Sequence, residues 1–232
     1  MLSSAVVIGI VADIDVAKAA NLVAREFSAL QSKQIPAIAK PEWPTSVEVA
    51  IESRDKAQTA IALGFPGPSR SDDDRFPASL VGTVASGLGG RFFDELRDRQ
   101  SLAYTVHAGP SVKRAGGMFA SYIATSPEKE EIARAGLLAE FAKLREEPVS
   151  DDELSRAKEY TVGSHAISQE SGGAQLAEML DAWMFGAGLH ELTEYDARVR
   201  AVSALEMLAV ARRYFDPARH VEGIVRGVGR TV

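Results

Sequence analysis

The sequence contains no cysteine, which excludes disulfide bonds, iron–sulfur ligation and thiol catalysis. It has no apolar run near the ~20 residues that a bilayer-spanning helix requires, so we expect no membrane partner. Excess positive charge is also lacking, and the net charge of −6 argues against a nucleic-acid partner. What is present is a chain of 232 residues that is 46% hydrophobic, which suits one α/β-type domain or two small subdomains sharing a core.

Targeting signals are scarce at the start of the chain. No basic region precedes the apolar stretch Ala5–Ala12, and Asp13 interrupts it, so we expect no signal peptide in this fragment. The lack of cysteine fits a reducing compartment and is equally compatible with export, so cytoplasmic and periplasmic locations both stay open. Because a strand-like run follows Met1 directly, we expect residues 1–232 to be a single domain that belongs to a longer chain.

Hydrophobic periodicity predicts alternating strands and helices. The β-branched run Ala5–Ala12 is typical of a strand buried on both faces. The other expected strands are Ser46–Glu52, Gln58–Phe65, Ala103–Ala108, Gly117–Ala124 and His220–Arg226. The expected helices are Val16–Leu30, Arg75–Ser86, Arg91–Arg97, Ser126 to about Glu147, Leu154–Ser168, and two or three within Gly172–Phe215. This order predicts an α+β fold, a two-layer sandwich with helices packed on one face of a mostly antiparallel sheet.

Turn and capping residues set the expected boundaries of these elements. The segment Phe65–Ser69 contains two prolines and a glycine, so we expect a turn there. Gly109 and Pro110 are expected to lie in the loop between two strands. Ser150 is followed three residues later by Glu153, which is the spacing of a capping box that starts a helix.

The stretch Leu88–Gly109 carries the most information about function. In it, Arg97 lies at the end of the expected short helix, and Tyr104 follows seven residues later at the start of a strand. A helix end next to a strand start can place a guanidinium and a phenol on one side, where both can bind a single carbonyl or carboxylate. The residues alone leave a plainer alternative open. In that alternative, Arg97 pairs with Asp94 or Glu95 at the surface and Tyr104 is a half-buried tyrosine of the sheet.

The same stretch resembles a known family. Leu-Gly-Gly-Arg-Phe-Phe, followed by Leu-Arg-x-x-x-x-Leu-Ala-Tyr-x-Val, is similar to the signature of the zinc-free C-terminal domain of pitrilysin/insulinase-type zinc peptidases. The Val6–Gly9 run with Asp13–Asp15, the Glu153–Lys158 helix and the final helix into Asp216-Pro217 agree with that domain, so the likeness covers nearly the whole chain. One departure is Ala12, where the family usually has a glycine.

The resemblance implies a function as well as a fold. In that family a His-x-x-Glu-His helix and a distant glutamate bind zinc in a different domain, and two halves close around an extended peptide. The zinc-free half contributes an arginine–tyrosine pair. The resemblance therefore implies that Arg97 and Tyr104 are both substrate-binding and catalytic residues that hydrogen-bond peptide carbonyls. Tyr104 would donate to the oxygen that gains charge at the scissile bond, which is a form of electrostatic catalysis.

The histidines argue against a catalytic metal in this chain. His107, His165, His190 and His220 form neither His-Glu-x-x-His nor His-x-x-Glu-His, the spacings that set two ligands on one helix face. His190-Glu191-Leu192-Thr193-Glu194 has a glutamate where the second histidine is needed, so we interpret it as a helix start. We expect no metal or cofactor here, and zinc in a partner domain or subunit.

Two hypotheses follow from the sequence. The first is a zinc-free, substrate-binding domain of a zinc metallopeptidase, inactive alone, whose partners are a zinc-bearing peptidase domain or subunit and an extended peptide. The alternative is a non-catalytic scaffold or assembly domain, because the same fold family includes core subunits of the respiratory cytochrome bc1 complex. Arg97 and Tyr104 at the family spacing favour the first hypothesis.

Overall fold

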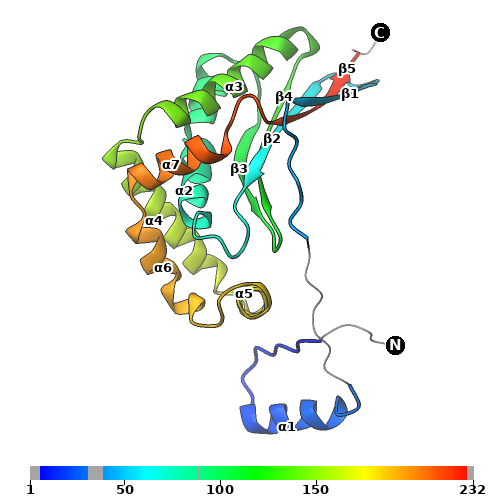
Figure 1. The fold of residues 1–232 in the computed structure, drawn as a ribbon, viewed down its shortest axis with the longest axis vertical. Coiled ribbons are helices and arrows are strands. Elements are labelled where there is room, and N and C mark those ends of the chain that lie inside the picture. Colours follow the sequence, from blue (N-terminus) through cyan, green and yellow to red (C-terminus); the bar gives the residue numbers. More distant parts are fainter. Residues whose placement is uncertain (1–5, 31–38, 88, 229–232) are drawn as a thin grey trace.

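The computed structural model describes residues 6–30, 39–87 and 89–228 (Figure 1). Its five-stranded sheet has the order β1-β5-β2-β4-β3, in which only β1 and β5 are parallel and the other neighbours are antiparallel. The strands are β1 Glu48–Arg54, β2 Thr59–Gly67, β3 Val106–Val112, β4 Gly117–Thr125 and β5 Val221–Gly227. The last strand thus lies inside the sheet, between the first two.

Helices cover one face of this sheet, as Figure 1 shows. Between Arg75 and Tyr214 they are α2 Arg75–Ser86, the π-helix η1 Phe93–Arg99, the 3-10 turn η2 Pro127–Lys129, α3 Glu130–Glu146, α4 Asp151–Ser168, α5 Gly172–Phe185, α6 Glu191–Ala201 and α7 Ala204–Tyr214. The expected α+β sandwich, with helices on one face of a mostly antiparallel sheet, is therefore confirmed.

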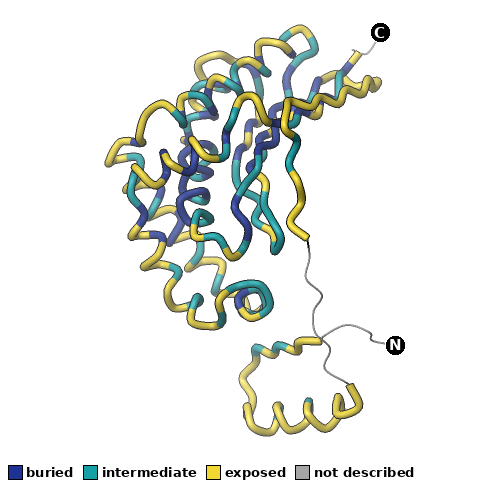
Figure 2. Tube along the Cα trace, in the orientation of Figure 1, coloured by how far each residue is buried: buried dark blue, intermediate teal, exposed yellow. Residues whose placement is uncertain are grey.

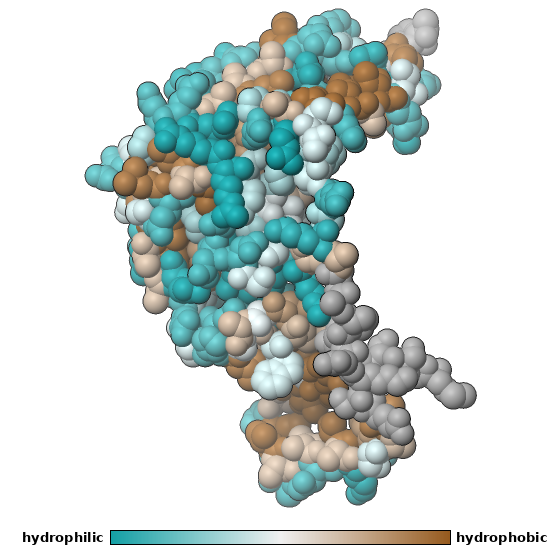
Figure 3. Space-filling model, in the orientation of Figure 1, coloured by the Kyte–Doolittle hydropathy of each residue, from teal (hydrophilic) through white to brown (hydrophobic). Residues whose placement is uncertain are grey.

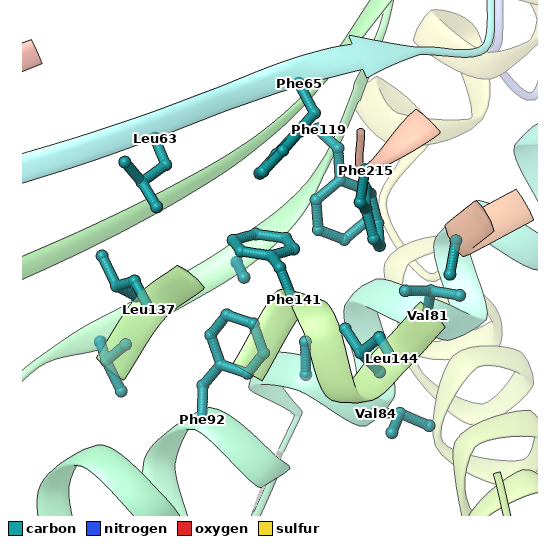
Figure 4. Packing of buried hydrophobic residues seen from close by; sticks show 14 of the residues in the cluster. Leu63, Phe65, Val81, Val84, Phe92, Phe119, Leu137, Phe141, Leu144 and Phe215 are labelled. Atoms are coloured by element: carbon teal, nitrogen blue, oxygen red, sulfur yellow. The ribbon is translucent and has the colours of Figure 1, made fainter. Parts of the chain in front are cut away.

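The core lies between the sheet and α3, where aromatic rings pack in tilted and edge-to-face pairs (Figure 4). Phe141 of α3 is its centre, because its ring lies 4.7 Å from Phe65 of β2 and 5.0 Å from Phe215. The ring of Phe92 lies 5.1 Å from Phe141. Phe92 directly precedes η1, so this contact fixes the start of η1 against the core.

A buried ionic cluster joins α3 to the end of the chain. The Glu222 side chain is 0% exposed, and it accepts hydrogen bonds from Arg134 and from His220. Burial raises the pKa of this carboxyl, but the hydrogen bonds from Arg134 and His220 outweigh it and hold the pKa below its usual value. The carboxylate is therefore kept ionised beneath the sheet, where it ties β5 to α3.

Two expected boundaries are wrong because proline is tolerated at sheet edges. β2 continues through Pro66, although a turn was expected there. Its pairing with β5 ends at Gly64, so Pro66 has a neighbouring strand only on the β4 side and needs no second ladder bond. β3 likewise continues through Gly109 and Pro110, because β3 is the last strand of the sheet order.

The strand expected at Ala5–Ala12 is also wrong over its described part. Residues 6–12 are extended but pair with no described strand, while Ala5 lies outside the described residues. Asp15 caps the following helix α1, Val16–Glu26, by accepting a hydrogen bond from the Lys18 backbone. Figure 2 shows this N-terminal part exposed along most of its length, below the body of the molecule. It supplies no residue to the core cluster.

Candidate functional site

The π-helix η1 forms the base of the site. The sequence predicted an ordinary short helix over Arg91–Arg97, whereas the structure has a π-helix over Phe93–Arg99, so Arg97 lies inside the helix. Leu96 is fully buried and anchors it. A Cβ on Gly136 of α3 would lie 2.8 Å from Leu96 Cδ2, so glycine there lets the two helices approach closely. π-helical turns are rare and are often found at functional sites.

The loop from Arg99 to Tyr104 is held at several points. Ser101 has φ +51, a left-handed conformation that reverses the chain after η1. Leu102 is buried, and its carbonyl accepts a hydrogen bond of 2.6 Å from the Thr125 hydroxyl of β4. Lys129 Nζ donates to the Ser101 carbonyl at 3.0 Å. These contacts fix the backbone directly before Tyr104.

Arg97 and Tyr104 lie together at the surface. The Arg97 guanidinium carbon lies 5.0 Å from the centre of the Tyr104 ring and 4.2 Å from that of Phe93. The Tyr104 residue is 80% exposed, and the Arg97 side chain is 35% exposed. A guanidinium that stacks on rings keeps its N–H edges available for hydrogen bonds. The pair therefore presents both kinds of donor to an incoming ligand.

The plainer alternative differs from this geometry in both parts. The side chain that pairs with Asp94 and Glu95 is Arg99, at 2.9 Å and 3.3 Å. Arg97 lies only within 3.8 Å of its neighbour Asp98, which is a loose contact. Tyr104 precedes β3 and is exposed, so it is not a half-buried tyrosine within the sheet.

A groove lies beside the pair, between α2, η1 and α4. Its walls include Gly87, Gly90 and Phe93, so it shares Phe93 with the Arg97 stack. Arg91 crosses the groove and binds Glu153 of α4 through two hydrogen bonds of 2.7 Å and 2.8 Å. That bidentate contact lowers the pKa of Glu153 to about 2, despite partial burial that raises it. Glu153 also completes the predicted capping box with Ser150, which the structure confirms.

The histidines lie apart from one another. His107 is exposed on β3, opposite Tyr122 of β4, and His190 directly precedes α6 as its N-terminal cap residue. His165 contacts Glu178 at 3.0 Å, and His220 belongs to the Glu222 cluster. In the described part of the chain, no three histidine, aspartate or glutamate side chains are grouped so as to hold a metal ion. The residues present here therefore do not fit a catalytic zinc.

Three residues that support the site were not predicted from the sequence. The first is Phe93, whose ring supports Arg97. Phe93 lies four residues before Arg97, and residues at this spacing are neighbours on a helix. That spacing could have indicated their contact. No pattern in the sequence indicated the roles of Leu102 and Thr125, since their contact joins a loop to a strand 23 residues away.

Across residues 6–30, 39–87 and 89–228, no helix has the length and apolarity for crossing a bilayer.

Comparison with known proteins shows the family of this chain. A family model described as "Peptidase M16 inactive domain" matches residues 2–160, which is more than half of the chain. The chain therefore belongs to the peptidase M16 family and corresponds to its inactive domain. The resemblance to a zinc-free peptidase domain is thereby confirmed.

Relatives in sequence are zinc proteases by name. An uncharacterized zinc protease of Streptomyces coelicolor is 27% identical over 165 residues, covering 71% of this chain and 36% of that protein. The uncharacterized zinc protease YmxG of Bacillus subtilis is 23% identical over 195 residues, covering 83% of this chain and 47% of that protein. The chain thus spans less than half the length of these relatives.

Solved structures agree on the fold. The peptidase M16 inactive domain from Pseudomonas fluorescens superposes with a TM-score of 0.83 at 21% identity. The match covers 93% of this chain and 52% of that chain. At this identity the likeness establishes the architecture alone.

Proposed function

We propose that this chain is the zinc-free, substrate-binding half of a zinc metallopeptidase, inactive alone and completed by a zinc-bearing domain or subunit. The observation that carries the proposal is the Arg97–Tyr104 pair. An exposed phenol lies beside a stacked guanidinium on a backbone fixed by Leu102, Thr125 and Lys129. The names of the relatives as zinc proteases support the reaction class.

The pair is suited to an extended peptide. Arg97 has N–H donors that can bind a peptide carbonyl, and its stacking on Phe93 and Tyr104 limits the side-chain freedom lost on binding. The Tyr104 hydroxyl donates to the carbonyl oxygen at the scissile bond, and this hydrogen bond strengthens as the oxygen gains negative charge. Removing one such donor typically raises the barrier by ~3 kcal/mol.

The zinc chemistry belongs to the partner. Zinc bound there would activate a water molecule and polarise the scissile carbonyl. In this chain Arg97 and Tyr104 bind and orient the peptide, and the Tyr104 hydroxyl directs its proton toward the reacting oxygen. The reaction is thus divided between two halves, with the hydrogen-bond donor to the scissile oxygen on one and the metal on the other.

A scaffold role is the second candidate. The fold superposes with a TM-score of 0.74 on a chain from the structure titled "Complex III2 from Candida albicans, Inz-5 bound", at 11% identity. That likeness shows that the architecture also occurs within a large assembly. In a scaffold, the exposed Arg97–Tyr104 pair would have no peptide to bind, so its removal would leave function unchanged.

Reconstitution tests the division of labour. Metal analysis and peptide cleavage are measured for the chain alone and after addition of the zinc-bearing half of the parent enzyme. We expect no stoichiometric zinc and no cleavage by the chain alone, and both in the mixture. Cleavage by the chain alone, or by the zinc-bearing half at the full rate without this chain, would refute the proposal.

A pair of arginine variants then separates binding from scaffolding. In the reconstituted enzyme, Arg97→Ala is expected to raise KM about tenfold or more, because a charged hydrogen-bond donor to the peptide is lost. Arg99→Ala is the matched control, since Arg99 lies on the same helix and, among the described residues, pairs with Asp94 and Glu95. Equal KM values for both variants would favour the scaffold role.

A further inference from the structure

The groove between α2, η1 and α4 continues the candidate site. It has a volume of about 560 Å³ and shares Phe93 with the Arg97 stack. Asp98, which directly follows Arg97, also lines it. An extended peptide advances ~3.3 Å per residue, so a peptide whose carbonyl binds Arg97 reaches the groove within a few residues. The groove is therefore placed to receive the side chain of a residue that flanks the bound carbonyl.

The floor of the groove is apolar. Val84 of α2 and Ala157 of α4 line it and are buried, and Phe93 of η1 is partly buried. Tyr160 of α4 also lines the groove and exposes about half of its surface, so it lies at the rim. An apolar floor of this kind suits the methylene groups of a side chain whose polar end points outward to the rim.

The acidic side chains of the groove are already paired. Hydrophilic residues cover much of the body, as the teal areas of Figure 3 show, so charges in the groove are informative only where they lack a partner. Three of the four carboxylates that line the groove are bound by an arginine. These pairs are Glu153 with Arg91, Asp94 with Arg99 and Glu159 with Arg200. The fourth, Asp98, has Arg97 at 3.8 Å. A further cation would therefore gain little by entering the groove.

Arg156 of α4 carries the unpaired charge of the groove. It lines the groove and is exposed, and among the described residues no carboxylate lies within ion-pair distance of it. The other arginine of the walls, Arg91, is occupied by Glu153 through two hydrogen bonds. A guanidinium binds a carboxylate through two parallel hydrogen bonds, which makes it selective for that group. The free partner that fits Arg156 is thus a carboxylate.

We infer that this groove is a subsite for an acidic side chain of the bound peptide, in which Arg156 binds the carboxylate and the apolar floor contacts the methylene groups. This inference rests on the proposed function, because it concerns the same peptide. It makes Arg156 a specificity-determining residue and defines the substrate class as extended peptides with a glutamate or aspartate close to the scissile bond. Since Arg156 is exposed, the preference is moderate and weakens with salt.

Pairs of peptides that differ only in Glu or Gln at one position provide the test. The two side chains have the same shape, and the substitution is moved through each position flanking the scissile bond. For the reconstituted enzyme, we expect kcat/KM to be about fivefold higher for Glu than for Gln at one position. The difference should lie mainly in KM, because the ion pair is already made in the ground state, and should shrink at high ionic strength.

Two cations of α4 give matched variants. Arg156→Gln should abolish the preference for Glu, and Arg156→Glu should shift it to Lys at the same position. Lys158→Gln is the control, because Lys158 carries the same charge on the same helix, does not line the groove, and donates to the Arg200 carbonyl at 2.7 Å. The control should keep the wild-type preference, which separates a contact in the groove from a general effect of net charge.

The outcomes also separate this inference from the proposed function. Equal rates for Glu and Gln at every position, or a preference that persists in Arg156→Gln, would overturn the inference, while cleavage by the mixture keeps the proposed function intact. Each peptide is made with a free and an amidated C-terminus. A rate that depends on the free terminus and not on the side chain would overturn the inference, because the terminal carboxylate would then be the ligand. No cleavage by the wild-type mixture would overturn both.

Discussion

Two apolar regions of the molecule differ in burial. The ring cluster around Phe141 is buried between sheet and helices, whereas residues 6–30 leave apolar side chains exposed. Both regions have sequences typical of regular secondary structure. They differ in their neighbours, because Phe141 lies among elements of its own sheet and helix layers, while residues 6–12 pair with no described strand. Burial is thus decided by the available partner and not by hydrophobicity alone.

The largest expected effect lies at the centre of the buried region. Phe141→Ala should lower the free energy of unfolding of the isolated chain by about 3–5 kcal/mol, because it leaves a cavity among several rings. Chemical denaturation measures this. Phe27→Ala in the N-terminal segment is the matched comparison and should change the value by less than about 0.5 kcal/mol. Similar losses for both variants would abolish the contrast between the regions.

The buried ionic cluster should show the next largest effect. Glu222→Gln leaves Arg134 and His220 without the carboxylate that they share, so we expect a loss of about 2–4 kcal/mol in the free energy of unfolding. Glu52→Gln provides a surface control, since its partner Arg54 is exposed and the pair is worth little. A loss no larger than that of the control would show that the cluster does not stabilise the body.

Low pH should lower the free energy of unfolding of the chain through protonation of Glu153. Its pKa is about 2 in the folded chain, below the ~4.3 of an unfolded glutamate, so its stabilising contribution is present above pH ~4.3 and is lost as the pH falls toward 2. The pair is partly exposed, so we expect only about 1 kcal/mol.

Comparison with Glu153→Gln isolates this contribution. The variant should be less stable than wild type near pH 6, and the two stabilities should converge near pH 2, as followed by denaturation at each pH. A constant difference across this range would contradict the assignment.

The smallest effect is expected in the exposed segment. Ala20→Asp should alter the unfolding free energy of the isolated chain by less than about 0.5 kcal/mol, because α1 contributes nothing to the core cluster. Thermal and chemical denaturation both measure this. A loss above 1 kcal/mol would show that residues 6–30 already stabilise the body without a partner.

Much of the fold could be predicted because its signals are local. The helix Arg75–Ser86 has the expected bounds, and the capping box at Ser150 starts α4. The wrong predictions concern segments whose structure depends on how strands pair in the sheet. Proline at 66 and 110 suggested turns, but each lies where one side of a strand needs no ladder bond. No local pattern reports which side of a strand is unpaired.

The candidate site was predictable only in its two central residues. The spacing of Arg97 and Tyr104 suggested that their side chains meet, and the structure places the guanidinium 5.0 Å from the ring centre. Their support was not predictable, because the π-helix, the left-handed Ser101 and the Thr125 contact depend on packing against β4 and α3. The catalytic role of the pair remains a prediction.

The turnover number of the reconstituted enzyme carrying Tyr104→Phe tests the central claim most directly. The substitution removes only the hydroxyl of an exposed residue, so the fold and the association of the halves should be unchanged. We predict that kcat falls by about 100-fold, with KM altered little, because the lost donor acts on the transition state. A wild-type kcat would contradict the assignment of Tyr104 as the hydrogen-bond donor to the scissile carbonyl oxygen.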